Sequence, residues 1–266
     1  MKQLLSRSLF LCLFILSYIH VGAQCPLDNN VFQAGESLDY DLYFKYGIIY
    51  KKAGVAKLNL DNHSYKGTDG YRMQLTARST GLIKSFFSLS DTLTSYSTRD
   101  FSPLAYTKDA HEDGDYSTER ASFQYDSDKT NLRMISVRNG KLRYDTTFVS
   151  NNCMYDVVSI LYYARTIDYS TMKKGDRRTV SFFAGRKMMN MDIEHQGIET
   201  VSANDGRKYY CIKLSLIGSA AAFEDKNEAM KIYLTDDMNK IPVRIESKLK
   251  IGSARVVLRG YKGQKY

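Results

Sequence analysis

Two adjacent carboxylates, Asp236 and Asp237, are the first residues in this sequence whose types could do chemistry. Two carboxylates can hydrolyse a glycosidic bond, but they must then lie about 5 to 9.5 Å apart on opposite sides of it. Neighbouring residues of a strand point to opposite faces instead. Pro242 follows closely, where its missing N–H suits a strand start. The pattern therefore predicts a turn held by aspartate side chains.

Two other acidic stretches alternate oxygen ligands in a way that suits Ca²⁺. They are HEDGD, with His111, Glu112, Asp113 and Asp115, and DSDKT, with Asp126, Asp128 and Thr130. Neither has the glycine and the distal glutamate of an EF-hand loop, and both fall where hairpin turns are expected. We therefore expect solvated turns there, with no metal and no cofactor.

A catalytic thiol would need a partnering histidine. The histidines beyond the N-terminal segment, His63, His111 and His195, all lie in polar, turn-like stretches, and the sequence contains no G-x-S-x-G, H-E-x-x-H, P-loop or C-x-x-C motif. The sequence therefore does not predict an enzyme. A hydrolase of envelope glycans, built from two converging carboxylates with separated pKa values, is the weaker alternative.

The N-terminal segment has the three parts of a secretory signal: a basic start, a short apolar run and a small-residue site that ends at Ala23. We expect residues 1–23 to be a signal peptide and residues 24–266 to form a single domain. One alternative is an uncleaved anchor, and another is a lipoprotein modified at Cys25, although the preceding Gln24 is not small. The expected location is the periplasm or the outer membrane of a Gram-negative bacterium.

Removing Lys2 and Arg7 with the signal leaves 36 basic against 29 acidic residues, a formal net charge of +7. The mature chain has no further apolar run long enough to span a bilayer. In an exported protein, a basic surface meets anionic lipid or acidic glycans before nucleic acid. Export also permits a disulfide among Cys25, Cys153 and Cys211, and the sequence leaves the three pairings open.

Period-two alternation is the dominant structural signal. In the stretch ESLDYDLYFKY, the residues on one side are Leu38, Tyr40, Leu42, Phe44 and Tyr46. Gly47 and Gly54 bracket the next stretch, IIYKKA, and Asp69-Gly70 is a hairpin signal. Further strand candidates are TLTSYS, LAYTKD, ERASFQYD, LRMISVR, KLRYDTTF, TVSFFAG, MMNMDIEH, KYYCIKLSLI, MKIYLTD, IPVRIES and ARVVLRGY.

Strands at this spacing predict an all-β, mainly antiparallel fold: a curled sheet, barrel or half-barrel of roughly a dozen strands. The exception is residues 153–166, where Met154, Val157, Val158, Leu161 and Tyr162 follow helical spacing behind Asn151 or Asn152 as N-cap. We expect one helix to cover the sheet there. A shorter helical turn is expected at TGLIKSFFS.

Several landmarks occur along the chain: Gly35-Glu36 before a strand, Gly47 and Gly54, Thr80-Gly81 leading to Asp91 and Tyr96, Asp156 to Ser159 followed by Tyr162 to Arg165, and Leu234 to Asp237 followed by Ile241-Pro242-Val243 and Gly252-Ser253. In these landmarks the chain resembles the family catalogued as domain of unknown function 3108, exported bacterial envelope proteins. The resemblance covers nearly all of the mature chain. It implies a twisted barrel or half-barrel sheet, and it supplies no catalytic residues.

The sequence offers a set of candidate ligand-binding residues. Arg165 ends the predicted helix, where a cation complements the helix dipole and can pair with Asp91 or meet an anionic ligand. The 21 Tyr and 12 Phe can line the concave face of a curled sheet. We expect an exported, non-enzymatic protein that binds an amphipathic ligand (lipid, lipoprotein or glycolipid) on that face, through Arg165, Asp91, Tyr162, Leu42 and Phe44. The alternative is an interaction module that binds other envelope proteins.

Overall fold

The computed structural model describes residues 25–81, 84, 88–126, 129–218, 230–248 and 252–266. The predicted signal peptide, most of TGLIKSFFS and Asp128 lie outside these residues. The strands are β1 (Ser37–Tyr46), β2 (Ile49–Tyr65), β3 (Thr68–Ser79), β4 (Leu89–Thr98), β5 (Pro103–Glu112), β6 (Asp115–Tyr125), β7 (Thr130–Arg138), β8 (Lys141–Ser150), β9 (Met154–Tyr155), β10 (Arg177–Ala184), β11 (Lys187–Ser202), β12 (Lys208–Ile217), β13 (Met230–Thr235), β14 (Pro242–Lys248) and β15 (Ser253–Lys262).

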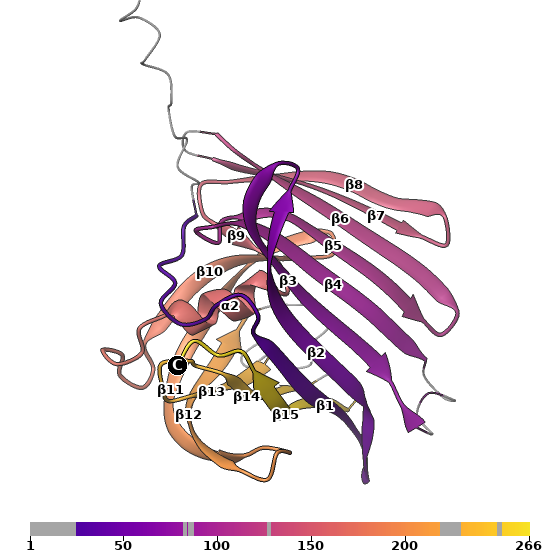
Figure 1. The fold of residues 1–266 in the computed structure, drawn as a ribbon. Helices are drawn as coiled ribbons and strands as arrows, with labels where there is room; N and C mark the ends of the chain where they lie inside the picture. Colours follow the sequence, from indigo (N-terminus) through magenta and orange to yellow (C-terminus); the bar gives the residue numbers. More distant parts are fainter. Residues whose placement is uncertain (1–24, 82–83, 85–87, 127–128, 219–229, 249–251) are drawn as a thin grey trace, which may run out of the picture.

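All fifteen strands belong to one sheet, in the order β8-β7-β6-β5-β4-β3-β2-β1-β15-β14-β13-β12-β11-β10-β9. Strand β1 pairs with both β2 and β15, so the two ends of the described chain meet in the middle of the sheet. The sheet curls into a nearly closed barrel whose two free edges are β8 and β9 (Figure 1). The all-β prediction is confirmed, with more strands than the dozen expected.

The predicted helix is present but shorter than expected. Helix α2 runs from Ser159 to Thr166, whereas the sequence placed its start near residue 153. Met154 and Tyr155 instead form β9, the one parallel strand, against β10. Asp156, and not Asn151 or Asn152, caps the helix start, because its Oδ1 accepts the N–H groups of Val158 and Ser159 at 2.8 and 2.9 Å.

The helix lies inside the curl of the sheet (Figure 1). Its buried residues pack into two apolar clusters that the inner faces of the strands supply. One cluster joins α2 to strands of both halves of the sheet, β1 to β7 and β9 to β15, and the other joins it to β9 to β13. No helix among the described residues is long and apolar enough to cross a membrane.

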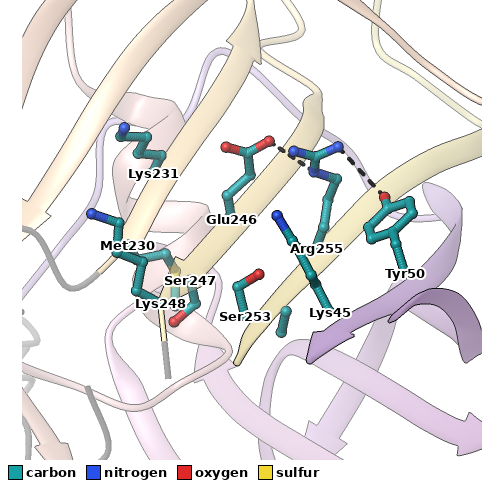
Figure 2. Close-up of a pocket in the computed structure, with 10 residues that line it drawn as sticks. Lys45, Tyr50, Met230, Lys231, Glu246, Ser247, Lys248, Ser253 and Arg255 are labelled. Carbon is teal, nitrogen blue, oxygen red and sulfur yellow. Dashed lines mark hydrogen bonds and ion pairs between the residues drawn. The ribbon is translucent and has the colours of Figure 1, made fainter. Parts of the chain in front are cut away.

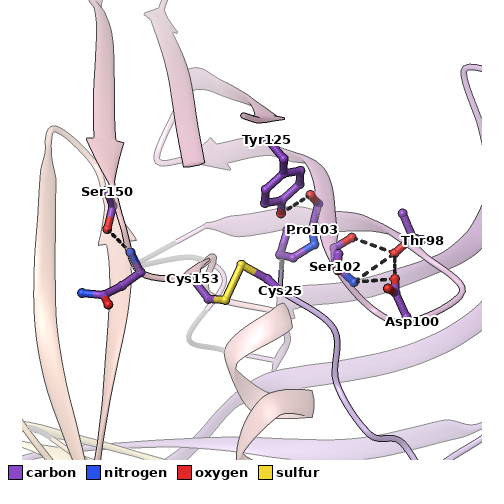
Figure 3. Close-up of a disulfide and its surroundings, with 9 residues drawn as sticks. Cys25, Thr98, Asp100, Ser102, Pro103, Tyr125, Ser150 and Cys153 are labelled. Atoms are coloured by element: carbon purple, nitrogen blue, oxygen red, sulfur yellow. Dashed lines mark hydrogen bonds between the residues drawn. A yellow bond between two sulfur atoms is a disulfide. The ribbon is translucent and has the colours of Figure 1, made fainter. Parts of the chain in front are cut away.

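A disulfide fastens the N-terminal segment to the chain just before β9. It joins Cys25 to Cys153, whose Cα atoms are 5.5 Å apart (Figure 3). This is one of the three pairings that the sequence left open. Cys211 is a free, buried thiol, and burial raises its pKa to about 12, so it remains protonated at neutral pH.

Most of the residues predicted to shape turns lie at turns or at a strand start, whereas Gly54 lies within a strand. Gly35 and Gly47 have φ angles of 95° and 56°, which favour glycine. Gly54 instead lies within β2, where a Cβ atom would come 2.2 Å from the carbonyl oxygen of Arg78. Asp237 Oδ1 accepts the N–H groups of Asn239 and Lys240 at 2.9 and 3.0 Å, as a turn aspartate does. Asp236 precedes it in the same turn, and Pro242 begins β14.

Candidate functional site

Arg165 and Tyr162, two predicted ligand-binding residues, are fully buried. Arg165 donates from Nη1 and Nη2 to the two carboxylate oxygens of Glu36, at 2.6 and 2.7 Å, and Nη2 also donates to the carbonyl of Asn239 at 2.9 Å. The partner of Arg165 is therefore Glu36, not Asp91. The guanidinium also lies over the rings of Phe32 and Tyr162, 4.9 and 5.6 Å from their centroids.

Leu42 and Phe44 are on β1, both half-buried. Leu42 packs against the apolar cluster, and Phe44 lies against Gly252. Neither residue lines any of five well-formed cavities among the described residues. Apolar side chains of α2 and of the surrounding strands pack together on the concave face next to the helix.

Asp91 lies on the same concave face, farther from the helix. It pairs directly with Ala110 of β5, so Lys108 and Glu112 flank it on that face. Lys108 Nζ is 3.5 Å from Glu112 Oε1, while Asp91 Oδ1 is buried without a hydrogen-bond partner. Burial raises the pKa of Asp91 to about 6, against the opposing charge of Lys108.

The raised pKa of Asp91 predicts a pH-dependent stability. Because the native state binds this proton more tightly than the unfolded chain, the contribution is fully present below the unfolded pKa of 3.8 and is lost as the pH rises through about 6. At about 1.4 kcal/mol per pKa unit, the loss is ~3 kcal/mol. We expect the free energy of unfolding of Asp91→Asn, relative to that of wild type, to rise by roughly this amount between pH 4 and pH 7. Urea unfolding at the two pH values measures it. A difference that is the same at both pH values, as expected for the exposed control Asp69→Asn, would contradict the assignment.

A cavity of about 270 Å³ opens on the concave face next to this cluster. The register places Glu112 opposite Asp115, Ser117 opposite Arg138 and Ser136 opposite Tyr144. Arg186, in the turn between β10 and β11, reaches it from across the open seam of the barrel. We call this cavity the concave polar site; its lining residues are Glu112, Asp115, Ser117, Ser136, Arg138, Arg143, Tyr144 and Arg186.

The concave polar site has an excess of positive charge. A hydrogen bond from Asn139 and the ion pair with Arg138 hold the pKa of Asp115 below its usual range. Arg143 and Arg186 make no ion pair with any carboxylate of the described residues. Arg186 lies 5.5 Å from the centroid of the Tyr144 ring. Two guanidinium groups are therefore available for an anion.

Tyr144 links this cavity to the apolar interior. Its hydroxyl donates to Glu119 Oε1 at 3.1 Å, and its ring packs against the core. Burial and the charge of Glu119 raise its pKa to about 12, so the phenol stays protonated and can donate a hydrogen bond at neutral pH.

Asp91 and Glu112 are neighbouring carboxyl groups on this face. Burial is the main cause of the raised pKa of Asp91, and Glu112 raises that pKa further. Among the residues that the structure describes, no group of three or more His, Cys, Asp or Glu could hold a metal ion.

Sequence reasoning found Asp91 but missed Arg143 and Arg186. Arg143 lies near the start of β8 and Arg186 in the turn after β10, and neither has a motif around it. The curl of the sheet brings them together, because β8 and the turn after β10 lie on the two sides of the seam. The sequence signal that came nearest to finding them is at Arg143. There the alternation of inward and outward side chains is interrupted, because the register between β7 and β8 shifts.

Comparison with known proteins places the chain in a family. A family model described as a protein of unknown function, DUF3108, matches residues 39–259. The chain belongs to the DUF3108 family. The resemblance predicted from the sequence is thereby confirmed. Among curated proteins, none matches the chain by sequence.

One solved structure supports the fold of this DUF3108 protein. A β-barrel-like DUF1849 protein from Brucella abortus has a TM-score of 0.60 at 11% identity, covering 87% of this chain and 98% of that one. Two further matches have TM-scores of 0.31: a Bacteroides fragilis protein described as exported with a YmcC-like fold (13% identity; 90% and 100% covered) and a Parabacteroides distasonis protein described as a lipoprotein (12%; 90% and 99%). Only the first likeness is strong enough to bear on the fold.

Proposed function

We propose that this DUF3108 protein is an exported, non-enzymatic protein of the cell envelope that binds the anionic headgroup of a lipid or glycolipid in the concave polar site. The observation that carries the proposal is the meeting of Arg143 and Arg186, neither of them paired with a carboxylate of the described residues, at one concave cavity. Guanidinium groups bind carboxylates and phosphates through paired N–H donors. Export is proposed from the secretory signal pattern in residues 1–23.

The size of the cavity indicates which part of the ligand is bound. At about 270 Å³ it is smaller than the ~300–1,000 Å³ of sites that enclose a drug-sized molecule. An anionic headgroup fits this space, while the acyl chains would stay in the membrane. Ser117 and Ser136 add hydroxyl groups and Tyr144 adds an aromatic ring, which suits a headgroup that carries sugar hydroxyls.

The test is native mass spectrometry, with organic extraction, of the mature protein purified gently from the envelope of a producing bacterium. We expect an anionic lipid or glycolipid at one per chain. The double variant Arg143→Ala/Arg186→Ala should bind it at least tenfold more weakly, since hydrogen bonds to charged groups contribute ~1.5–3 kcal/mol each. Lys187→Ala is the matched control, because Lys187 is an exposed cation beside Arg186 that does not line the cavity. An apo wild-type mass, or a double variant that keeps the ligand, would refute the proposal.

One observation favours a second candidate, an interaction module that binds another envelope protein. Strand β8 has a hydrogen-bonded neighbour on one side only, and two of its apolar side chains, Leu142 and Val149, are 64% and 54% exposed. An unpaired edge of this kind can accept a strand from a partner. A protein that co-purifies with apo wild type and is lost on Val149→Lys would favour this candidate over headgroup binding.

A further inference from the structure

Two further cavities lie on the convex face of the sheet, away from the concave polar site. Their volumes are about 190 and 240 Å³, and both are lined by Tyr50 and Arg255 (Figure 2). We call this continuous surface the tyrosine groove. The residues that define it here are Tyr43, Lys45, Tyr50, Asn204, Arg244, Glu246, Lys248 and Arg255.

The strand register places the tyrosine rings and the charged side chains of the groove on the outward face, whereas Met230, Ser247 and Ala254, which also line the first cavity, belong to the inward row of Phe44. Tyr43 pairs with Arg255, and Arg255 pairs with Glu246, so the three side chains form a row across β1, β15 and β14. The neighbouring row on the same strands, Leu42 and Val256, packs against the apolar core. Because successive side chains of a strand point to opposite faces, the tyrosine groove lies on the convex side.

Two stacked rings form the centre of the tyrosine groove. Tyr43 and Tyr50 lie 5.2 Å apart with an interplanar angle of 7°, and Tyr50 is 44% exposed. The hydroxyl of Tyr43 accepts a hydrogen bond from Asn204 at 2.9 Å, and the Arg255 guanidinium lies 5.6 Å from the Tyr50 centroid. The groove therefore presents a fixed, exposed aromatic surface next to a cation.

The charges of the groove are strongly unequal. Five cations line the two cavities, Lys45, Lys231, Lys248, Arg244 and Arg255, whereas Glu246 is the one carboxylate among the lining residues. Glu246 is already bonded to Arg255 at 2.9 Å and lies 3.7 Å from Arg244. Lys45 and Lys248 stand at the rim of the first cavity (Figure 2). An anionic ligand would meet a net positive surface along the whole groove.

We propose that the tyrosine groove binds an extended anionic glycan, whose sugar rings carry carboxylate or phosphate groups. Two adjoining cavities on either side of an aromatic ring suit successive rings of a chain, with the apolar face of a sugar on Tyr50 and its anionic groups on Lys45, Lys248 and Arg255. A flat lipid surface would not fill the recessed cavities. The groove is independent of the concave polar site, since it uses other strands and the opposite face of the sheet.

The test is calorimetric titration of the mature protein with two probes, a galacturonic acid tetramer and a phosphorylated mannose oligosaccharide. We expect at least one to bind, and neutral maltotetraose not to bind. Tyr50→Ala and the double variant Lys45→Glu/Lys248→Glu should each weaken binding about tenfold or more, and added salt should weaken it further. Lys174→Glu, at an exposed cation outside both cavities, is the matched control and should bind as wild type does.

Three results would overturn the proposal. They are no binding of either anionic probe, equal binding of maltotetraose, and variants that bind as tightly as wild type. Vesicles of phosphatidylcholine and phosphatidylglycerol (7:3) test the other source of anionic groups, and binding to vesicles without binding to either glycan would also refute it. If Tyr50→Ala fails to fold, the surface variant Lys45→Glu/Lys248→Glu decides the outcome, because both lysines are exposed.

Discussion

Replacing Arg165 with methionine is expected to lower the free energy of unfolding by about 3–5 kcal/mol. The change leaves the Glu36 carboxylate, which is 1% exposed, without its two guanidinium hydrogen bonds in the interior. The carbonyl of Asn239 loses a donor in the same place. Urea unfolding followed by far-ultraviolet circular dichroism measures the effect, as a lower midpoint with an unchanged slope.

The double variant Glu36→Leu/Arg165→Met distinguishes two quantities: the destabilisation caused by an unpaired buried charge, and the net stabilisation contributed by the ion pair. Because the double change removes both charges, it should recover most of the stability that the single change loses. If Arg165→Met alone costs less than about 1 kcal/mol, the Glu36 carboxylate must find water or another donor, and the buried ion pair would not hold the N-terminal segment as the structure indicates.

Removing the Cys25–Cys153 disulfide is the second large expected effect. The bond closes a loop of 128 residues, and the chain-entropy model assigns about 4–5 kcal/mol to a loop of this size. We therefore expect Cys25→Ser and Cys153→Ser each to lower the stability by roughly 2–5 kcal/mol. The double variant should be no less stable than either single variant, since one bond is lost in all three.

Reductant provides the control for this prediction. Dithiothreitol should destabilise wild type by the same amount as the cysteine variants, and it should leave the double variant unchanged, because Cys211 is a free thiol. A wild-type protein with the same urea midpoint with and without reductant would show that the bond does not stabilise the fold. Unfolding must then be followed with the disulfide state confirmed by mass, since mixed redox states are not two-state.

The all-β class could be read from the sequence because side chains alternate with period two wherever a strand has one buried face. The stretch from Ser37 to Tyr46 shows this clearly, with Leu38 and Tyr40 buried in the structure. The alternation is local, so it can be recognised in a short stretch without knowledge of the rest of the chain. It failed at Met154 and Tyr155, whose apolar side chains fit a helical spacing as well as a two-residue strand.

The helix boundary shows where local reasoning stops. Asn151 and Asn152 are suitable caps by residue type, but the structure uses Asp156, whose second carboxylate oxygen accepts a hydrogen bond from Ser95 of β4 at 2.7 Å. That partner is 61 residues away in the sequence. A short-range pattern cannot choose between candidate caps when a distant strand decides which one is held.

The sequence by itself determined the all-β class and the presence of a helix near α2, because alternation and turn residues are local properties. The family followed from the resemblance of its motifs. Tertiary structure alone decided that Arg165 pairs with Glu36, 129 residues away, and that Arg143 and Arg186 share one cavity. The physical reason is the curl of a single sheet. It brings β8 near β10 without hydrogen bonds between the two strands. Their proximity therefore produces no periodic pattern in the sequence.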